Sequence, residues 1–195
     1  MSSPVEEDLR FHVGPWTEQD YLAMPEDRSR IELLDGGLLV NPAPGSRHQR
    51  LSSRLWLALE SARPAGVETL ETVNVRVAPG RILIPDLVVV SGSGADRTVW
   101  DAVDVQMVVE IVSPGSVAAD RAIKPPLYAA AGIANYVRIE QRRGQPSAVR
   151  FRLDQGGYVQ VAGPPADQVL RLTQPFVAEI DLAALLAAER PGQAR

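Results

Sequence analysis

Apolar and polar positions near the N-terminus predict a short helix followed by a β-hairpin. Thr17 precedes acidic residues, which is typical of an N-cap, and the helix is expected to end near Met24. Apolar stretches at residues 30–34 and 38–40 flank Asp35-Gly36-Gly37, a sequence that favours a tight hairpin turn.

A long amphipathic helix is predicted between residues 46 and 63. Ser46 and Gln49 have the spacing of a capping box, in which each side chain accepts a hydrogen bond from the other residue's backbone N–H. Arg63 is followed by a proline, which is expected to end the helix there. The apolar residues recur at helical spacing and predict one buried face: Leu51, Leu55, Leu59 and Ala62.

Three runs rich in β-branched residues predict buried strands, at residues 67–77, 82–90 and 105–112. The last two are almost continuously apolar, which is typical of strands covered on both faces. Two acids interrupt this pattern, because Asp86 follows Pro85 in the second run and Glu110 lies inside the third.

The remaining sequence predicts a helix at residues 126–131 that ends at Gly132, and a last helix at 182–189 that Asp181 would cap. Further strands are expected at residues 135–139, 148–153 and 158–161. Helices and strands alternate without an internal repeat, so the pattern predicts a single α/β domain.

Composition narrows the class of protein. The chain has 195 residues, 45% of them hydrophobic, which suffices for one domain with a sizeable core. No apolar run could cross a bilayer, and residues 1–8 are acidic, so neither a membrane span nor a secretory signal is expected. These features predict a soluble, cytoplasmic protein.

The chain has no cysteine and two histidines, His12 and His48. Disulfides, a thiolate nucleophile and cysteine-ligated zinc are therefore excluded, and a histidine-rich zinc site is not expected. A metal would have to be held mostly by oxygen atoms, which favours Mg²⁺ or Mn²⁺.

Charge is distributed unevenly around a net value of −4. Residues 1–35 carry nine acids and three arginines, whereas residues 111–153 carry seven bases and two acids. The basic stretch fits either a solvated strand pair or a rim that contacts phosphate groups. Lys124 is the single lysine among 20 basic residues, so it marks a place where a compact ammonium could be required.

Asp86 and Glu110 suggest chemistry, because an ionised carboxylate in an apolar strand is costly unless it is paired or binds a metal. Two carboxylates on neighbouring strands could share one divalent cation. Lys124, fourteen residues after Glu110, could reach back from the following helix to orient a water molecule. Glu32 in the first hairpin is a third candidate acid.

Pro85-Asp86 followed by Glu110-Ile111-Val112 resembles the P-D…(D/E)-x-K signature of the restriction-endonuclease-like superfamily, with Val112 in place of the lysine. More closely, the chain resembles the Uma-two family of restriction endonucleases over residues 17–187. The matching stretches are Ile31-Glu32-Leu33-Leu34-Asp35-Gly36, His48-Gln49-Arg50-Leu51, Pro85-Asp86-Leu87, residues 108–116 and 120–124, Leu127-Tyr128-Ala129, Ala131-Gly132-Ile133 and Tyr136.

The resemblance implies a mixed central β-sheet flanked by helices, with residues 1–16 as an extension and 188–195 as a tail. It also implies a Mg²⁺- or Mn²⁺-dependent endonuclease acting on DNA, and by analogy a possible homodimer. The implied catalytic residues are Asp86, Glu110, Lys124 and Glu32. The implied metal ligands are Asp86, Glu110 and the Ile111 carbonyl, and the implied substrate contacts are His48 and Gln49.

One departure from the family pattern favours an alternative. Pro125-Pro126 stands where charged residues are usual, so the helix is expected to begin there and Lys124 to be extended. In that geometry the Lys124 ammonium would not reach Asp86 and Glu110 well. This favours a catalytically inactive module that binds nucleic acid or has a regulatory role. A metal-free glycosidase using the carboxylate pair is a third hypothesis, which the dispersed tryptophans at 16, 56 and 100 support poorly.

Overall fold

The computed structural model describes residues 12–24, 31–92, 94, 96–142, 145–161 and 168–187. The expected N-terminal extension and C-terminal tail therefore lie largely outside the described residues. Helices in the described part are α2 (Glu18–Ala23), α3 (Ser46–Ala62), α4 (Lys124–Ala130) and α5 (Leu182–Leu186), with a 3-10 turn η2 (Ala102–Asp104) and a π-helical turn η3 (Ala119–Ile123). None of these helices has the length and apolar character needed to cross a membrane.

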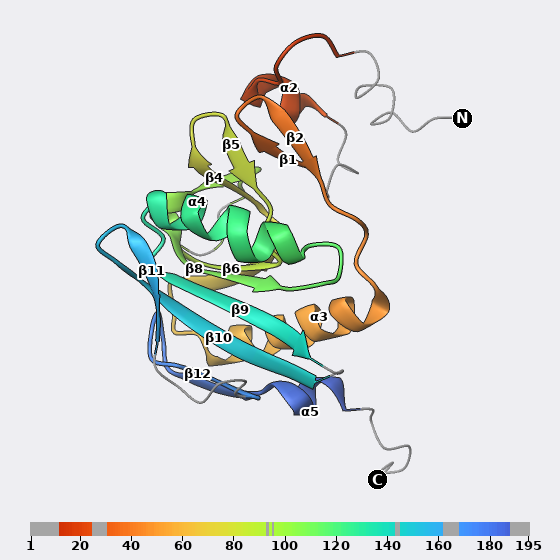
Figure 1. Cartoon of the computed structure of the whole chain (residues 1–195). Helices are drawn as coiled ribbons and strands as arrows, with labels where there is room; N and C mark the ends of the chain where they lie inside the picture. The colour runs from red at the N-terminus through yellow and green to blue at the C-terminus, as the bar shows by residue number, and fades with distance from the viewer. Residues whose placement is uncertain are drawn as a thin grey trace.

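A six-stranded mixed sheet forms the centre of the molecule (Figure 1). Its spatial order is β11-β10-β9-β8-β6-β3, and only the β8–β9 pair is parallel among these neighbours. The strands are β3 (Val67–Glu71), β6 (Leu87–Ser91), β8 (Val105–Ile111), β9 (Asn135–Arg142), β10 (Gln145–Asp154) and β11 (Gly157–Gln160).

A second, five-stranded sheet has the order β2-β1-β5-β4-β7 and contains the predicted hairpin. Asp35 and Gly36 both have positive φ, as a tight turn between β1 and β2 requires. The strands are β1 (Ile31–Leu34), β2 (Gly37–Val40), β4 (Asn74–Ala78), β5 (Arg81–Leu83) and β7 (Val99–Asp101), and a separate ribbon pairs β12 (Val169–Leu172) with β13 (Ala178–Asp181).

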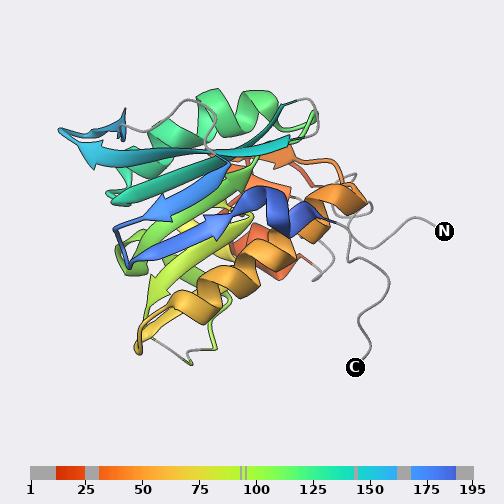
Figure 2. The same cartoon turned by 90° about the horizontal axis from the view of Figure 1, so that it is seen from below.

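Two apolar cores cover opposite faces of the central sheet. On one face, Leu51, Leu55 and Leu59 of α3 pack with alternate residues of β6, β8 and β9, together with the β12–β13 ribbon and α5. On the other face, Tyr128 of α4 and residues of the five-stranded sheet pack against Val108 and Tyr136. Figure 2 shows α3 and α4 on the two sides of the sheet.

Alternation along β8 explains where Glu110 points. Val109 and Ile111 face the α3 side, so Val108 and Glu110 face α4. The full burial predicted for residues 82–90 and 105–112 is confirmed for β6 and β8, because almost every residue in these two strands is buried. The prediction of a mixed central sheet flanked by helices is also confirmed.

Two predicted strands are each divided between the two sheets. Residues 67–77 form β3 and β4, separated at Thr72, whose φ is +51°. Residues 82–90 form β5 and β6, separated at Pro85. Each break lets the chain leave one sheet and enter the other, and the short strands β7, β12 and β13 were not predicted.

The caps agree with the predictions at two helices and differ at one. Thr17 forms a capping box with Asp20, and the Asp181 side chain accepts hydrogen bonds from the first turn of α5. The capping box predicted for Ser46 and Gln49 is wrong, because Gly45 is the N-cap of α3 and makes no side-chain cap bond.

Helical structure before Lys124 corrects a second prediction. The turn η3 leads directly into α4, and Lys124 has helical angles of φ −68° and ψ −43° rather than an extended conformation. Pro125 and Pro126 occupy the first turn of α4, where a missing backbone N–H removes no intrahelical hydrogen bond.

Candidate active site

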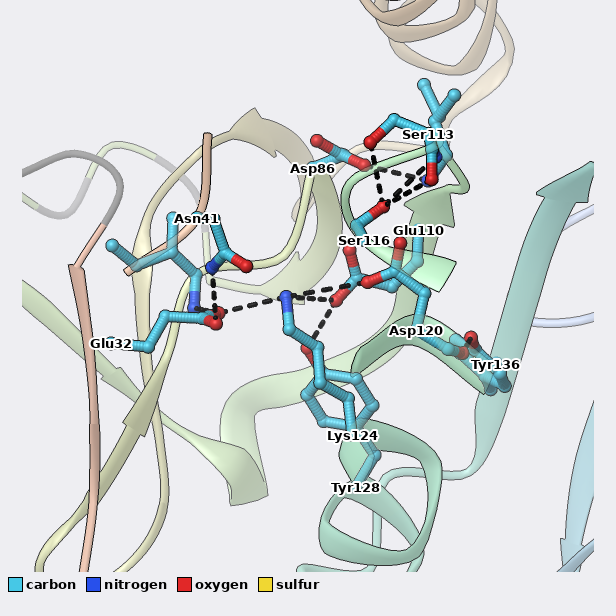
Figure 3. A network of polar contacts seen from close by, with 12 residues as sticks. Glu32, Asn41, Asp86, Glu110, Ser113, Ser116, Asp120, Lys124, Tyr128 and Tyr136 are labelled. Carbon is cyan, nitrogen blue, oxygen red and sulfur yellow. Dashed lines mark hydrogen bonds and ion pairs between the residues drawn. The ribbon is translucent and has the colours of Figure 1, made fainter. Parts of the chain in front are cut away.

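The candidate residues from four separate segments meet beside the C-terminal end of β8, an interior strand of the central sheet (Figure 3). Glu32 comes from β1, Asp86 from the turn before β6, Glu110 from β8 and Lys124 from the start of α4. All four are buried, with exposed fractions between 0% and 8%. The structure therefore brings together the four residues that the family resemblance implies as catalytic.

Lys124 is the centre of this cluster. Its Nζ lies 2.9 Å from Glu32 Oε1, 3.1 Å from Glu110 Oε1 and 3.8 Å from Asp120 Oδ1. Burial lowers the pKa of Lys124, but the three carboxylates outweigh burial and hold the pKa above its ordinary value. The side chain therefore remains an ammonium and acts as a hydrogen-bond donor and positive charge.

Glu110 is the most strongly perturbed acid of the cluster. Its Oε1 accepts hydrogen bonds from Lys124 Nζ at 3.1 Å and from the Tyr128 hydroxyl at 2.6 Å. Burial nevertheless raises the pKa of Glu110 well above its ordinary value, because Lys124 offsets only part of the lost hydration and the neighbouring acids add repulsion. Ionised Glu110 would gain from a further cation nearby.

Glu32 is held in place from both of its oxygens. Oε1 accepts from the Ile84 backbone N–H at 2.6 Å, and Oε2 accepts from Asn41 Nδ2 at 2.8 Å. Since Oε1 also contacts Lys124, Glu32 connects the five-stranded sheet to the start of α4. These contacts fix the Glu32 carboxylate beside the ammonium of Lys124.

Asp86 and Ile111 share a contact with His48. Asp86 Oδ2 accepts from the Ile111 backbone N–H at 2.7 Å and lies 3.2 Å from His48 Nε2. The same His48 nitrogen lies 3.1 Å from the Ile111 carbonyl oxygen. His48 thus contacts two of the three groups expected to ligate metal. Gln49 is exposed and lines an adjoining pocket with His48 and Asp86.

Asp120 and Tyr128 belong to the site but were not proposed as functional residues. Burial raises the pKa of Asp120, whereas Lys124 and a hydrogen bond with Ser116 lower it. The effect of burial is larger, and the pKa rises to about 6. The quoted stretches 120–124 and 127–129 contained both residues, and helical spacing from Lys124 to Asp120 and Tyr128 could have placed all three on one face.

A small cavity opens between these groups. Its volume is about 40 Å³, and its walls include Asp86, Glu110 and Ile111. A single buried water needs about 10–15 Å³, so the cavity has room for a few water-sized species. Within the described ranges, no three His, Asp or Glu side chains already surround a common point at metal-ligand spacing.

The donor chemistry nevertheless fits a hard divalent cation. Three acids, Asp86, Glu110 and Asp120, line the cavity together with Ile111, and carboxylate and carbonyl oxygens suit Mg²⁺ and Mn²⁺. Three buried acids, Glu32, Glu110 and Asp120, lie within 4 Å of the single lysine, and a fourth, Asp86, contacts His48. This excess of negative charge is costly in a buried site unless a cation offsets it.

Comparison with known proteins is consistent with this description. Residues 18–185 match the Uma2 family, described as "Putative restriction endonuclease". A solved structure, "a putative nuclease belonging to DUF820 from Anabaena variabilis ATCC 29413", superposes with a TM-score of 0.70 at 17% identity, covering 89% of this chain and 100% of that chain. That likeness confirms the predicted fold class, and no curated protein matches. Because the family match covers most of its length, the chain belongs to the Uma2 family.

Proposed function

We propose that this protein is a metal-dependent endonuclease that hydrolyses phosphodiester bonds of DNA. Membership of a nuclease family supports the reaction class. The observation that carries the proposal is the burial of Asp86 and Glu110 beside one cavity, with the ammonium of Lys124 at its wall. Carboxylates and an ammonium at one point are suited to positioning a water molecule and a phosphate group.

Asp86, Glu110 and the Ile111 carbonyl are the groups that would hold Mg²⁺ or Mn²⁺. Such a cation lowers the pKa of a bound water and stabilises charge on a phosphoryl oxygen. His48 keeps Asp86 and the Ile111 carbonyl close to each other through its Nε2 contacts. Gln49 is exposed beside them and is proposed to contact the substrate. His48 is buried, so it can touch the substrate only where its ring lines the cavity.

Lys124 assists the attacking water as a donor and positive charge. Because three carboxylates raise its pKa, the ammonium does not act as a proton acceptor at neutral pH. It is proposed to orient the water and to offset the negative charge that develops on the phosphate. Glu32 and Asp120 hold the ammonium in this position.

The helical start of α4 favours an active site over an inactive module. The expected loss of reach of Lys124 is one ground for the alternative, but Nζ lies 3.1 Å from Glu110 Oε1 despite the following prolines. The glycosidase hypothesis has less support. Burial raises the pKa of Glu110, as a general acid would require, but among the described residues no Phe, Tyr or Trp lines the cavity as expected of a sugar-binding cleft.

The test is nicking of supercoiled plasmid with Mg²⁺ or Mn²⁺ by the wild type, Glu110→Gln and Lys124→Met. Nicking is expected to require metal and to be lost in both variants. Asp104→Asn is the matched control, since it removes an acid that pairs with Arg97 outside the site. Nicking that survives Glu110→Gln, or a wild type that neither nicks DNA nor binds Mn²⁺ in calorimetry, would refute the proposal.

A further inference from the structure

A pocket on the far side of α4 from the candidate active site has the composition of a nucleotide-binding site. It lies between α4 and strands β9–β11 and has a volume of about 330 Å³, within the range of small-molecule sites. Its walls include Pro125, Pro126, Tyr158, Phe151 and two arginines. We propose that this pocket binds an unpaired nucleobase of the substrate strand, with its phosphate at the arginines.

Aromatic rings form the wall provided by the sheet. Tyr136, Phe151 and Tyr158 lie on β9, β10 and β11, and the Tyr136 ring stacks with each of the other two at centroid distances of 5.4 Å. Tyr136 is fully buried, whereas Phe151 and Tyr158 are only partly buried. The partly exposed rings offer flat faces on which a base can stack, which is how single strands are bound without sequence preference.

Positive charge lies at the border of the same pocket. Arg121 and Arg138 both contact Glu140, with Arg121 Nε at 3.1 Å and Arg138 Nε at 2.8 Å from Glu140 Oε1. Two guanidinium groups against one carboxylate leave a net charge of +1 beside the rings. Arg138 also lies over the Phe151 ring at 5.2 Å, and 43% of the Arg121 side chain is exposed to solvent. Aromatic faces beside an accessible guanidinium match a base attached to a phosphate.

The pocket is close enough to the candidate active site to hold the same strand. Asp120 and Lys124 line the active-site cavity, whereas their chain neighbours Arg121 and Pro125 line the pocket, so one helical segment separates the two. Phe151 on β10 pairs with Tyr136 on β9, which pairs with Val108 on β8. The Phe151 backbone is therefore two strands across and two residues along from Glu110, a separation of about 12 Å. Successive nucleotides of one strand in a B-form duplex are about 3.4 Å apart along the axis, and an unpaired strand can extend further, so the two places lie within a few nucleotides of each other.

Pro125 and Pro126 would form the apolar wall of the proposed base-binding pocket. They begin α4 without loss of a helical hydrogen bond, and they also present apolar rings to the pocket. A charged side chain there would interrupt the apolar wall opposite the aromatic rings. The inference rests on the proposed nuclease function for the identity of the ligand, although binding can be measured without catalysis.

The test measures binding of a fluorescein-labelled twelve-residue oligothymidylate by anisotropy in EDTA, which prevents cleavage. Tyr158→Leu, Pro126→Glu and Arg121→Gln are each expected to raise the Kd at least about fivefold, the lower limit for losing one stacked base. Tyr158→Phe is expected to retain binding, because it keeps the ring and loses only the hydroxyl bond to the Ile133 carbonyl. Arg97→Gln is the control, since Arg97 stacks on Trp100 outside the pocket.

The outcomes separate this inference from the proposed function. Unchanged binding in both Tyr158→Leu and Pro126→Glu, or no binding of the oligonucleotide by the wild type, would overturn the pocket assignment even if plasmid nicking is observed. Equal loss in Tyr158→Leu and Tyr158→Phe would also overturn it, because the effect would then come from the hydroxyl bond. Pocket-dependent binding by a wild type that neither nicks plasmid nor binds Mn²⁺ would support the pocket and refute the nuclease proposal.

Discussion

Asp120→Asn is expected to stabilise the metal-free protein at neutral pH, although it removes a charged group from the candidate active site. The side chain is 3% exposed, and burial raises the pKa of Asp120 from 3.8 to about 6 despite the opposing effects of Lys124 and Ser116. At a pH above both values, this difference corresponds to about 3 kcal/mol of folding free energy lost through ionisation. Asparagine has the same shape without this cost.

The effect has a defined pH dependence. Between pH 3.8 and about 6, the folded state binds more protons at Asp120 than the unfolded state does. The contribution of this group to stability therefore falls as pH rises through that interval and is constant above it. The advantage of Asp120→Asn should accordingly grow between these two pKa values and then level off.

Urea unfolding in EDTA at a series of pH values from 4.5 to 8 would measure this difference. Asp154→Asn, at an exposed aspartate at the end of β10, is the matched control and should change the free energy of unfolding by less than about 0.5 kcal/mol. A variant that is no more stable than the wild type at pH 8 would refute the reasoning. A difference that does not increase between pH 4.5 and 6.5 would do the same.

Three further predictions concern the structure around the site. Gly115→Ala should destabilise the protein by about 1–3 kcal/mol in urea unfolding, because the added Cβ would lie 2.6 Å from Cγ of Pro42; an unchanged midpoint would contradict this. Burial would raise the pKa of Glu140, but Arg121 and Arg138 together outweigh burial and lower it. The contribution of Glu140 to stability is therefore present above pH 4.5 and is lost as the pH falls below that value. Urea unfolding should therefore find Glu140→Gln less stable than the wild type at pH 7, with a smaller difference at pH 3.5. Leu55→Ala, at a fully buried position of α3, should lower the free energy of unfolding by about 2–5 kcal/mol, and thermal unfolding would show whether it does.

Local sequence was sufficient for elements whose stabilisation is itself local. The helix α3 was predicted from its apolar spacing, and the β1–β2 turn from Asp35-Gly36-Gly37, because helical periodicity and turn geometry depend on residues close in the chain. The capping box predicted at Ser46 failed because Gly45 takes the N-cap position, although serine is the more favoured N-cap residue by local preference.

Division of strands between sheets could not be predicted in the same way. Residues 67–77 read as one strand, but Thr72 adopts a positive φ and the chain enters the second sheet. A threonine accepts that conformation only when tertiary pairing on both sides compensates for it. The short strands β7, β12 and β13 similarly depend on partners distant in sequence.

The candidate site shows the same division. Asp86 and Glu110 were recognisable from the sequence because ionisable residues interrupt apolar strands, and that anomaly is visible without a structure. The sequence alone could not show that Lys124 Nζ lies 2.9 Å from Glu32 Oε1, because that contact joins α4 to the β1–β2 hairpin of the five-stranded sheet. The expected extended conformation of Lys124 was wrong, since η3 continues into α4 and fixes a helical backbone.

The sequence by itself therefore determined the α/β class, the main helices and the two candidate carboxylates Asp86 and Glu110, all of which follow from periodicity and from charges placed in apolar surroundings. Only the tertiary structure decided which groups surround Lys124, how far burial raises the pKa of Asp120, and that an aromatic pocket lies behind α4. Burial and proximity between distant segments are properties of the packed chain, and electrostatic effects depend directly on both.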